Sequence, residues 1–176
     1  MEAILDAAHA CLSSDPDASI GDIAKAAGVG RVTLYGHFPT RADLVDAVVT
    51  RALTAAEHAL AVIDLSGDPR EAIHRLVAGS WSLTADAGAL VAAAERSLPA
   101  AQIRAAHDGM LVPVGELLER GRSEGVFRND LPTSWLAAVL HSVVHCAATE
   151  VDAGRLDPGD AASYITKTVL ASFAPS

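Results

Sequence analysis

Four side chains suited to nucleic-acid contact lie close together in one short segment. An arginine can donate to guanine or to a phosphate, and a threonine offers a hydroxyl and a methyl group to a base edge. Tyrosine and histidine form hydrogen bonds with phosphates. Here the four are Arg31, Thr33, Tyr35 and His37. Arg41 follows in the first turn of the next predicted helix, where backbone amides also favour a phosphate.

The segment that carries these residues is locally basic in an acidic chain. Between Ile23 and Ala42 it contains Lys25, Arg31 and Arg41 and no acidic residue, whereas the 176-residue chain has a formal net charge of -9. The overall charge argues against a general nucleic-acid binder. The local excess of basic residues favours a protein that binds a specific site.

The flanking residues predict two short helices joined by a turn. Ser19 is a capping residue and Asp22 follows three positions later, which indicates a helix start. Gly28 suits the left-handed residue that ends such a helix, and a second helix over 31–37 is closed by Pro39. This is the layout of a helix-turn-helix, whose second helix lies in the DNA major groove. The same spacing also arises by chance in alanine-rich bundles, in which the aromatic residues would only be core.

Three strings of residues resemble the N-terminal domain of the tetracycline-repressor (TetR) family. They are Ile4-Leu5-Asp6-Ala7-Ala8, Ile20-x-x-Ile23-Ala24-x-x-Ala27-Gly28-Val29 and Thr33-Leu34-Tyr35-x-His37-Phe38-Pro39-x-Arg41-x-Asp43-Leu44. The likeness is strong over residues 2–50 and weaker beyond them. It implies a cytoplasmic, homodimeric transcription factor, usually a repressor that a small molecule releases from a palindromic DNA operator.

The resemblance also implies which residues contact DNA. Ser19 matches a phosphate-contacting cap, residues 31–33 match the base-reading surface, and the following polar residues match backbone contacts. The predicted DNA-binding residues are Ser19, Lys25, Arg31, Val32, Thr33, Tyr35, His37 and Arg41. Gly30 and Gly36 depart from the family pattern, and the chain begins at the first helix without a basic arm, so we expect weaker operator binding.

Composition predicts an all-α protein. Hydrophobic residues make up 51% of the chain and aromatic residues only 4%, with alanine dominant. We expect a three-helix helix-turn-helix domain over residues 1–45 and a larger helical bundle over 46–176. The apolar spacing and the breaks predict about nine helices, over 2–13, 19–28, 31–37, 40–63, 68–83, 88–98, 100–125, 133–153 and 157–173.

The cysteines and the N-terminus predict a cytoplasmic protein. Cys11 and Cys146 lie in apolar helical contexts, which favours a reducing compartment over a disulfide framework. The first residues lack the basic region of a secretory signal, and no apolar run approaches the roughly 18 residues of a membrane span.

The last predicted helix has one apolar stripe, and the helix before it, over 133–153, is apolar over much of its circumference. A helix of this kind packs against both its own chain and a partner, or lies at the centre of a monomer. The resemblance implies the first arrangement, in which the two closing helices of each subunit form a four-helix bundle. The two recognition helices would then lie about 34 Å apart and read a palindromic site.

The resemblance implies an effector cavity inside the larger helical bundle over residues 46–176. A mostly apolar lining suits an apolar or aromatic compound. The predicted ligand-binding residues are Trp81, Met110, Leu111, Phe127, Trp135 and His141. Any one of them is also compatible with an ordinary core position.

Two histidines have the spacing of a metal clamp. His141 and His145 fall at i and i+4 on one helical face, but Cys146 is rotated by about 100° and is a poor third ligand. His107 and Asp108 lie on another segment. We therefore expect no metal, no cofactor and no enzyme activity. The alternative from a different functional class is an enzyme that binds a metal ion through these two histidines.

A second alternative is a regulator-like dimer that has lost its affinity for DNA. Residues 1–50 contain seven acidic residues against three basic ones, so the basic segment must face DNA while the acidic residues face away. If the basic segment does not face DNA, the chain would act through partner or ligand binding.

Overall fold

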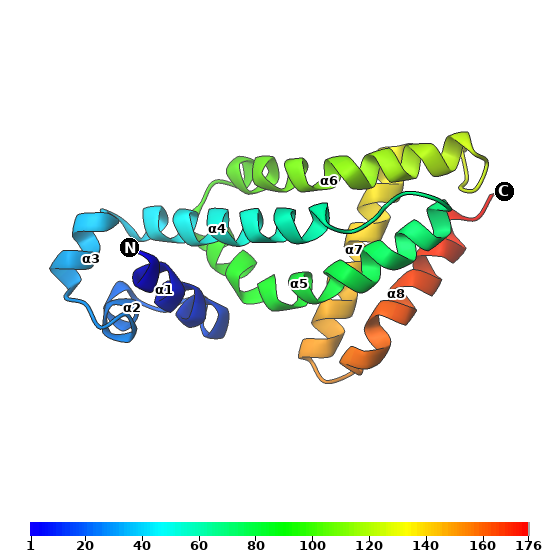
Figure 1. Cartoon of the computed structure of the whole chain (residues 1–176). Helices are drawn as coiled ribbons and strands as arrows, with labels where there is room; N and C mark the ends of the chain where they lie inside the picture. The colour runs from blue at the N-terminus through cyan, green and yellow to red at the C-terminus, as the bar shows by residue number, and fades with distance from the viewer. Residues whose placement is uncertain (176) are drawn as a thin grey trace. The chain divides into compact units, whose positions relative to one another are not determined.

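The computed structural model describes residues 1–175, with the side chains of residues 85–86 and 104–110 left out of the description. The described chain is entirely helical and contains no strand, which confirms the all-α prediction (Figure 1). Its helices are α1 (Glu2–Ser14), α2 (Ile20–Ala26), α3 (Arg31–His37), α4 (Arg41–Ala61), α5 (Pro69–Ser97), α6 (Ala100–Ser123), α7 (Thr133–Asp152) and α8 (Pro158–Phe173).

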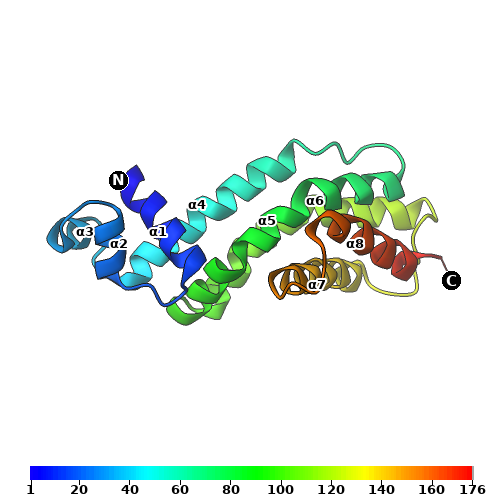
Figure 2. The same ribbon diagram turned by 90° about the horizontal axis from the view of Figure 1, so that it is seen from below.

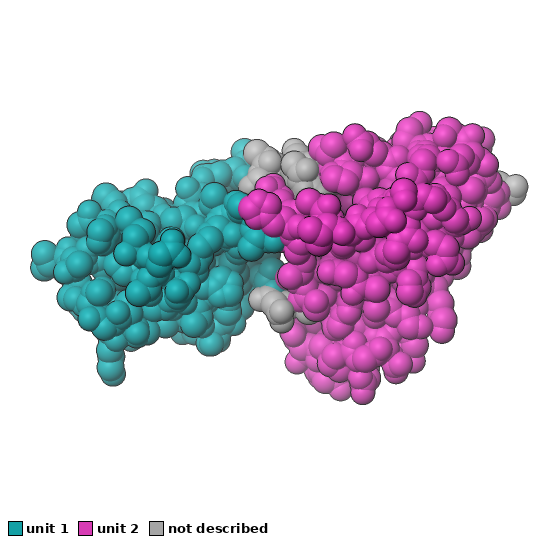
Figure 3. All heavy atoms as spheres, viewed as in Figure 1, with its two compact units in different colours: residues 1–55, 86–107 teal, residues 56–85, 108–176 magenta. Residues whose placement is uncertain are grey.

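The chain forms two compact units, coloured separately in Figure 3. Unit 1 comprises Met1–Ala55 and Asp86–His107, and unit 2 comprises Ala56–Ala85 and Asp108–Ser176. Unit 1 therefore includes the C-terminal part of α5 and the start of α6. The domain boundary expected from the sequence, at residue 45, places both segments in the larger helical bundle. The reason for this difference is the core of unit 1, which Leu90, Ala93 and Ala94 of α5 complete.

In unit 1, helices α1 to α4 and the C-terminal part of α5 contribute to one small apolar core. Ile4, Leu34 and Leu44 are among its buried members, and Leu5 and Val29 pack against them. The Ser19–Asp22 capping box begins α2, and Gly28 follows the end of α2 with a φ of 67°, as predicted.

Another capping box begins α4. The Thr40 hydroxyl accepts from the Asp43 amide at 3.1 Å, and the Asp43 carboxylate accepts from the Thr40 amide at 2.9 Å. The two boxes lie on either side of α3, so the positions at which α2 and α4 begin are both fixed by local hydrogen bonds.

In unit 2, α7 and α8 run side by side (Figure 2). Asp157 caps α8 by accepting from the Gly159 amide, with Pro158 in the first turn. The core of this unit includes an edge-to-face pair between Phe127 and Phe173, whose ring centroids are 5.7 Å apart.

Most predicted helix ends agree with the structure within about two residues. One element differs, because the segments predicted over 68–83 and 88–98 are parts of a single helix, α5. No proline interrupts the chain between them, and Gly88 alone weakens a helix by only about 1 kcal/mol, so the helix continues, with a bend between Pro69–Thr84 and Ala87–Ser97. Within the described residues no single helix is long and apolar enough to cross a membrane. The two parts of α5, which are bent relative to each other, reach the length and hydropathy of a membrane span only when they are taken together.

Candidate nucleic-acid interface

One buried leucine orients α3. Leu34 is 0% exposed and belongs to the core of unit 1, whereas every other residue of α3 is exposed. The backbone turns out of the helix at Phe38, which has φ -131° and ψ 97° and is itself buried before Pro39. This seven-residue helix is therefore held from one side and presents its other side to solvent.

The exposed side of α3 carries the predicted base-reading residues. Val32 is 87% exposed and Tyr35 is 49% exposed, and Arg31, Thr33 and His37 are exposed as well. An isopropyl group this exposed has no packing role, but it can contact the methyl group of a thymine. The arrangement joins one apolar contact to several hydrogen-bonding groups on the surface of a single helix.

The start of α2 adds a hydroxyl and a carboxylate. The Ser19 hydroxyl accepts from the Asp22 amide at 3.2 Å and donates to the Asp22 carboxylate at 2.5 Å. Hydrogen bonds from the Ser19 side chain and backbone lower the pKa of Asp22, and the charges of Lys25 and Arg31 lower it further. A negative charge thus lies next to the two cations that would face phosphates.

Arg31 lies over the backbone of α2. A Cβ atom added at Gly21 would collide with the Arg31 guanidinium, so the absence of a side chain at Gly21 leaves room for it. The guanidinium therefore rests on α2 near Asp22, although the residue as a whole is exposed. Since the side chain is long and flexible, it can leave this position for a phosphate or a base.

Arg41, another residue predicted to contact DNA, lies in a different environment from the exposed residues of α3. Its guanidinium donates to the Ser97 hydroxyl at 2.5 Å and to the Pro16 carbonyl at 2.6 Å, and the side chain is half-buried. Arg96 next to Ser97 pairs with Asp17 at 2.9 Å. These contacts join α4, the loop before α2 and the end of α5 within unit 1, so the structure gives Arg41 an internal role in place of a free surface position.

The residues predicted for an effector cavity have several environments in unit 2. Trp81 and Leu111 are half-buried, whereas Phe127 is buried in the core with its ring against Gly121. Trp135 is 58% exposed on α7, which places it on the helix surface and not in an interior lining. The Met110 side chain lies outside the described residues, as do those of His107 and Asp108.

The two histidines of α7 lie together as their spacing predicts. The ring centroids of His141 and His145 are 4.2 Å apart, and both residues are half-buried. Among the residues that the structure describes, no group of three or more histidine, cysteine or acidic side chains could hold a metal ion.

The comparisons with known proteins agree with the helix-turn-helix geometry. Residues 4–48 match the family described as bacterial regulatory proteins, tetR family. The HTH-type transcriptional repressor LfrR of Mycolicibacterium smegmatis is 41% identical over 78 residues, which are 44% of this chain and 41% of LfrR. The aligned part thus spans about two-fifths of that relative.

Solved structures resemble the whole chain. LfrR from Mycobacterium smegmatis in complex with proflavine has a TM-score of 0.77 at 25% identity, covering 98% of this chain and 94% of that chain. The fatty acid degradation regulator FadR from Bacillus halodurans has a TM-score of 0.77 at 21% identity, covering 96% and 97%, and shows the shared fold alone. Residues 4–48 of this chain therefore match the tetR family of bacterial regulatory proteins, and the chain as a whole shares its fold with solved TetR-like regulators.

Proposed function

We propose that this chain is a transcriptional repressor that binds a specific DNA operator through α3. One observation carries the proposal: Leu34 holds α3 from inside, while Val32, Thr33 and Tyr35 project from its exposed side. Lys25 and Arg31 supply nearby positive charge for phosphates. Such a protein would act in the cytoplasm, where its operator is found.

The exposed side of α7 and α8 supports a dimer. Trp135 and Tyr164 are 58% and 51% exposed, and Ala138, Ser142 and Cys146 extend the exposed surface along α7. Two large exposed aromatic residues with small neighbours fit a helix-to-helix contact between two copies. A dimer formed in this way would present two α3 helices to a palindromic operator.

We further propose that a small, mostly apolar effector binds in unit 2 and releases the protein from DNA. LfrR, the relative with 25% identity over nearly the whole chain, has been solved with proflavine, a planar aromatic cation. The proposed contacts are the half-buried Trp81, Leu111 and His141, together with Met110. The exposed Trp135 and the core residue Phe127 remain candidates from the sequence that the geometry supports less well.

A regulator-like protein with little DNA affinity is the second candidate. Two observations favour it: Arg41 is hydrogen-bonded inside unit 1, and Asp22 places a carboxylate beside Lys25 and Arg31. Both features reduce the positive charge available for phosphates.

Selection of bound fragments from the host genome at low salt, followed by gel-shift assays, separates these two candidates. We expect the wild-type protein to retain a palindromic fragment and the Thr33→Ala variant to lose about 1–3 kcal/mol of discrimination at one position of it. Glu71→Ala, a change at an exposed residue of unit 2, serves as the control. Recovery of no fragment by a folded, dimeric wild-type protein would refute the repressor and favour the second candidate.

A further inference from the structure

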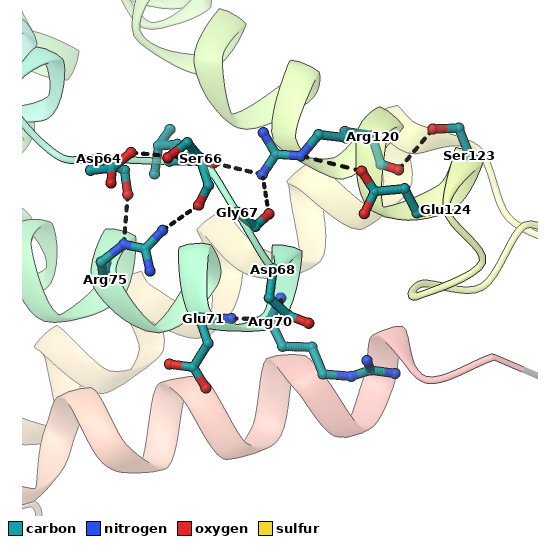
Figure 4. A network of polar contacts seen from close by, with 11 residues as sticks. Asp64, Ser66, Gly67, Asp68, Arg70, Glu71, Arg75, Arg120, Ser123 and Glu124 are labelled. Atoms are coloured by element: carbon teal, nitrogen blue, oxygen red, sulfur yellow. Dashed lines mark hydrogen bonds and ion pairs between the residues drawn. The ribbon is translucent and has the colours of Figure 1, made fainter.

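The loop between α4 and α5 is fixed by two arginines (Figure 4). Arg75 of α5 donates to the carbonyls of Asp64 at 2.6 Å and Ser66 at 2.5 Å. Arg120 of α6 donates to the carbonyls of Leu65 at 2.6 Å and Gly67 at 3.3 Å. Four consecutive carbonyl groups of the loop are therefore bound by guanidinium groups, which gives the loop a defined path without regular secondary structure.

Packing fixes the apolar side of the same loop. Ile63 packs against α5 at Gly79, where an added Cβ atom would lie only 2.9 Å from Ile63 Cδ1. Ile63 and Leu65 are half-buried, and both pack against the core of unit 2. The loop is thus a preformed wall, and side chains lining its surface keep their positions.

This wall borders a cavity of about 500 Å³ in unit 2. Its apolar lining includes Leu60, Ile63, Leu65 and Leu117, and its charged lining consists of Glu116 and Arg120. The volume is within the range of about 300–1,000 Å³ that small-molecule sites occupy. None of the residues predicted for the effector lines this cavity.

The two charged groups of the lining differ in what they can offer a ligand. Two hydrogen bonds of the Arg120 guanidinium go to the loop carbonyls, and its Nε lies 3.9 Å from the Glu124 carboxylate. Glu116 is exposed and forms no hydrogen bond or ion pair with any described residue. The charge that the cavity leaves unbalanced is therefore negative, in a chain that is itself acidic.

We infer that this cavity is a second ligand site, which takes a small organic cation with an apolar body. The apolar part lies against the aliphatic wall, and the positive group pairs with the Glu116 carboxylate. The inference does not depend on DNA binding, because the cavity is built entirely from residues of unit 2.

Two tricyclic dyes of matched shape test the inference by fluorescence titration. Proflavine is a cation at pH 7.5, whereas acridine is neutral at that pH. We expect proflavine to bind, and its affinity to fall about fivefold in Glu116→Gln, the change expected for a solvent-exposed ion pair. Acridine affinity should be the same in both proteins. Glu71→Gln, which removes a carboxylate of unit 2 outside the cavity, should leave both affinities unchanged.

A variant that fills the cavity assigns the binding to this site. Ala61 is an exposed residue of the lining, so Ala61→Trp should lower the number of proflavine molecules bound per chain by one while circular dichroism confirms that the protein remains folded. The same number of bound proflavine molecules in Ala61→Trp as in the wild-type protein, or an unchanged proflavine affinity in Glu116→Gln at the site that Ala61→Trp removes, would overturn the inference. Failure of the wild-type protein to bind proflavine would overturn it as well. Gel shifts on the same variants report the repressor function separately, since a wild-type protein that binds dye but no DNA refutes only that function.

Discussion

Arg41 at the start of α4 donates a hydrogen bond of 2.5 Å to Ser97 at the end of α5, across 56 positions of sequence. The same guanidinium donates to the Pro16 carbonyl at 2.6 Å. This one side chain thereby joins the start of α4, the loop before α2 and the end of α5 within unit 1. A residue that resembles a phosphate contact in sequence is thus placed to stabilise the helix-turn-helix unit.

We expect Arg41→Ala to lower the free energy of unfolding by about 2 kcal/mol, because it removes two charge-assisted hydrogen bonds in a half-buried position. Arg51→Ala is the control, since its contact with Asp6 is a surface ion pair worth at most about 1 kcal/mol. Chemical denaturation of both variants measures the difference. Equal losses in the two variants would contradict an internal role for Arg41.

Substitutions at two neighbouring residues of α3 should separate stability from DNA binding. Leu34→Ala removes a fully buried side chain and should cost about 2–5 kcal/mol. Val32→Ala changes a side chain that is 87% exposed and should alter stability by less than about 0.5 kcal/mol. Thermal unfolding checks both values, and gel shifts should show weaker operator binding for Val32→Ala despite its normal stability. A destabilised Val32→Ala variant would mean that this side chain packs in the protein.

The features predicted correctly from the sequence are those that local chemistry decides. The Ser19–Asp22 box, the left-handed Gly28 and the stop before Pro39 each depend on residues a few positions apart, and all three are present. They fix the position of α3, which is why the exposed residues of that helix were predictable.

The features that were not predictable depend on distant contacts. Nothing in the residues around Arg41 indicates that Ser97 is its partner, and no local pattern assigns residues 86–107 to unit 1. The cavity beside Glu116 was missed for the same reason, since its lining comes from α4, a loop and α6. Two arginines that bind loop carbonyls look, in the sequence, like ordinary surface charges.

Two glycines of α6 should respond to alanine in opposite ways. A Cβ atom at Gly121 would collide with the Phe127 ring, which is buried in the core of unit 2 and cannot move aside freely. Gly121→Ala should therefore destabilise the protein by about 1–3 kcal/mol. A Cβ atom at Gly115 meets nothing within 4 Å, so Gly115→Ala should stabilise the helix by up to about 1 kcal/mol. Melting temperatures that shift in the same direction would contradict this account.

Asp22 should make the stability of unit 1 depend on pH in the acidic range. Hydrogen bonds from Ser19 and the charges of Lys25 and Arg31 lower the pKa of Asp22 in the folded protein. A carboxyl group with a lowered pKa binds its proton more weakly in the folded state than in the unfolded state. Its contribution is therefore complete above the ordinary aspartate pKa of about 4 and is lost as the pH falls through the folded value.

The comparison of wild-type protein with Asp22→Asn isolates this contribution. The other carboxyl groups with lowered pKa, Asp64 and Glu150, are present in both proteins and cancel in the difference. We expect the wild-type protein to melt at a higher temperature at pH 7 and the two melting temperatures to converge below about pH 4. A difference that stays constant between pH 7 and pH 3 would show that the Asp22 charge does not stabilise the start of α2.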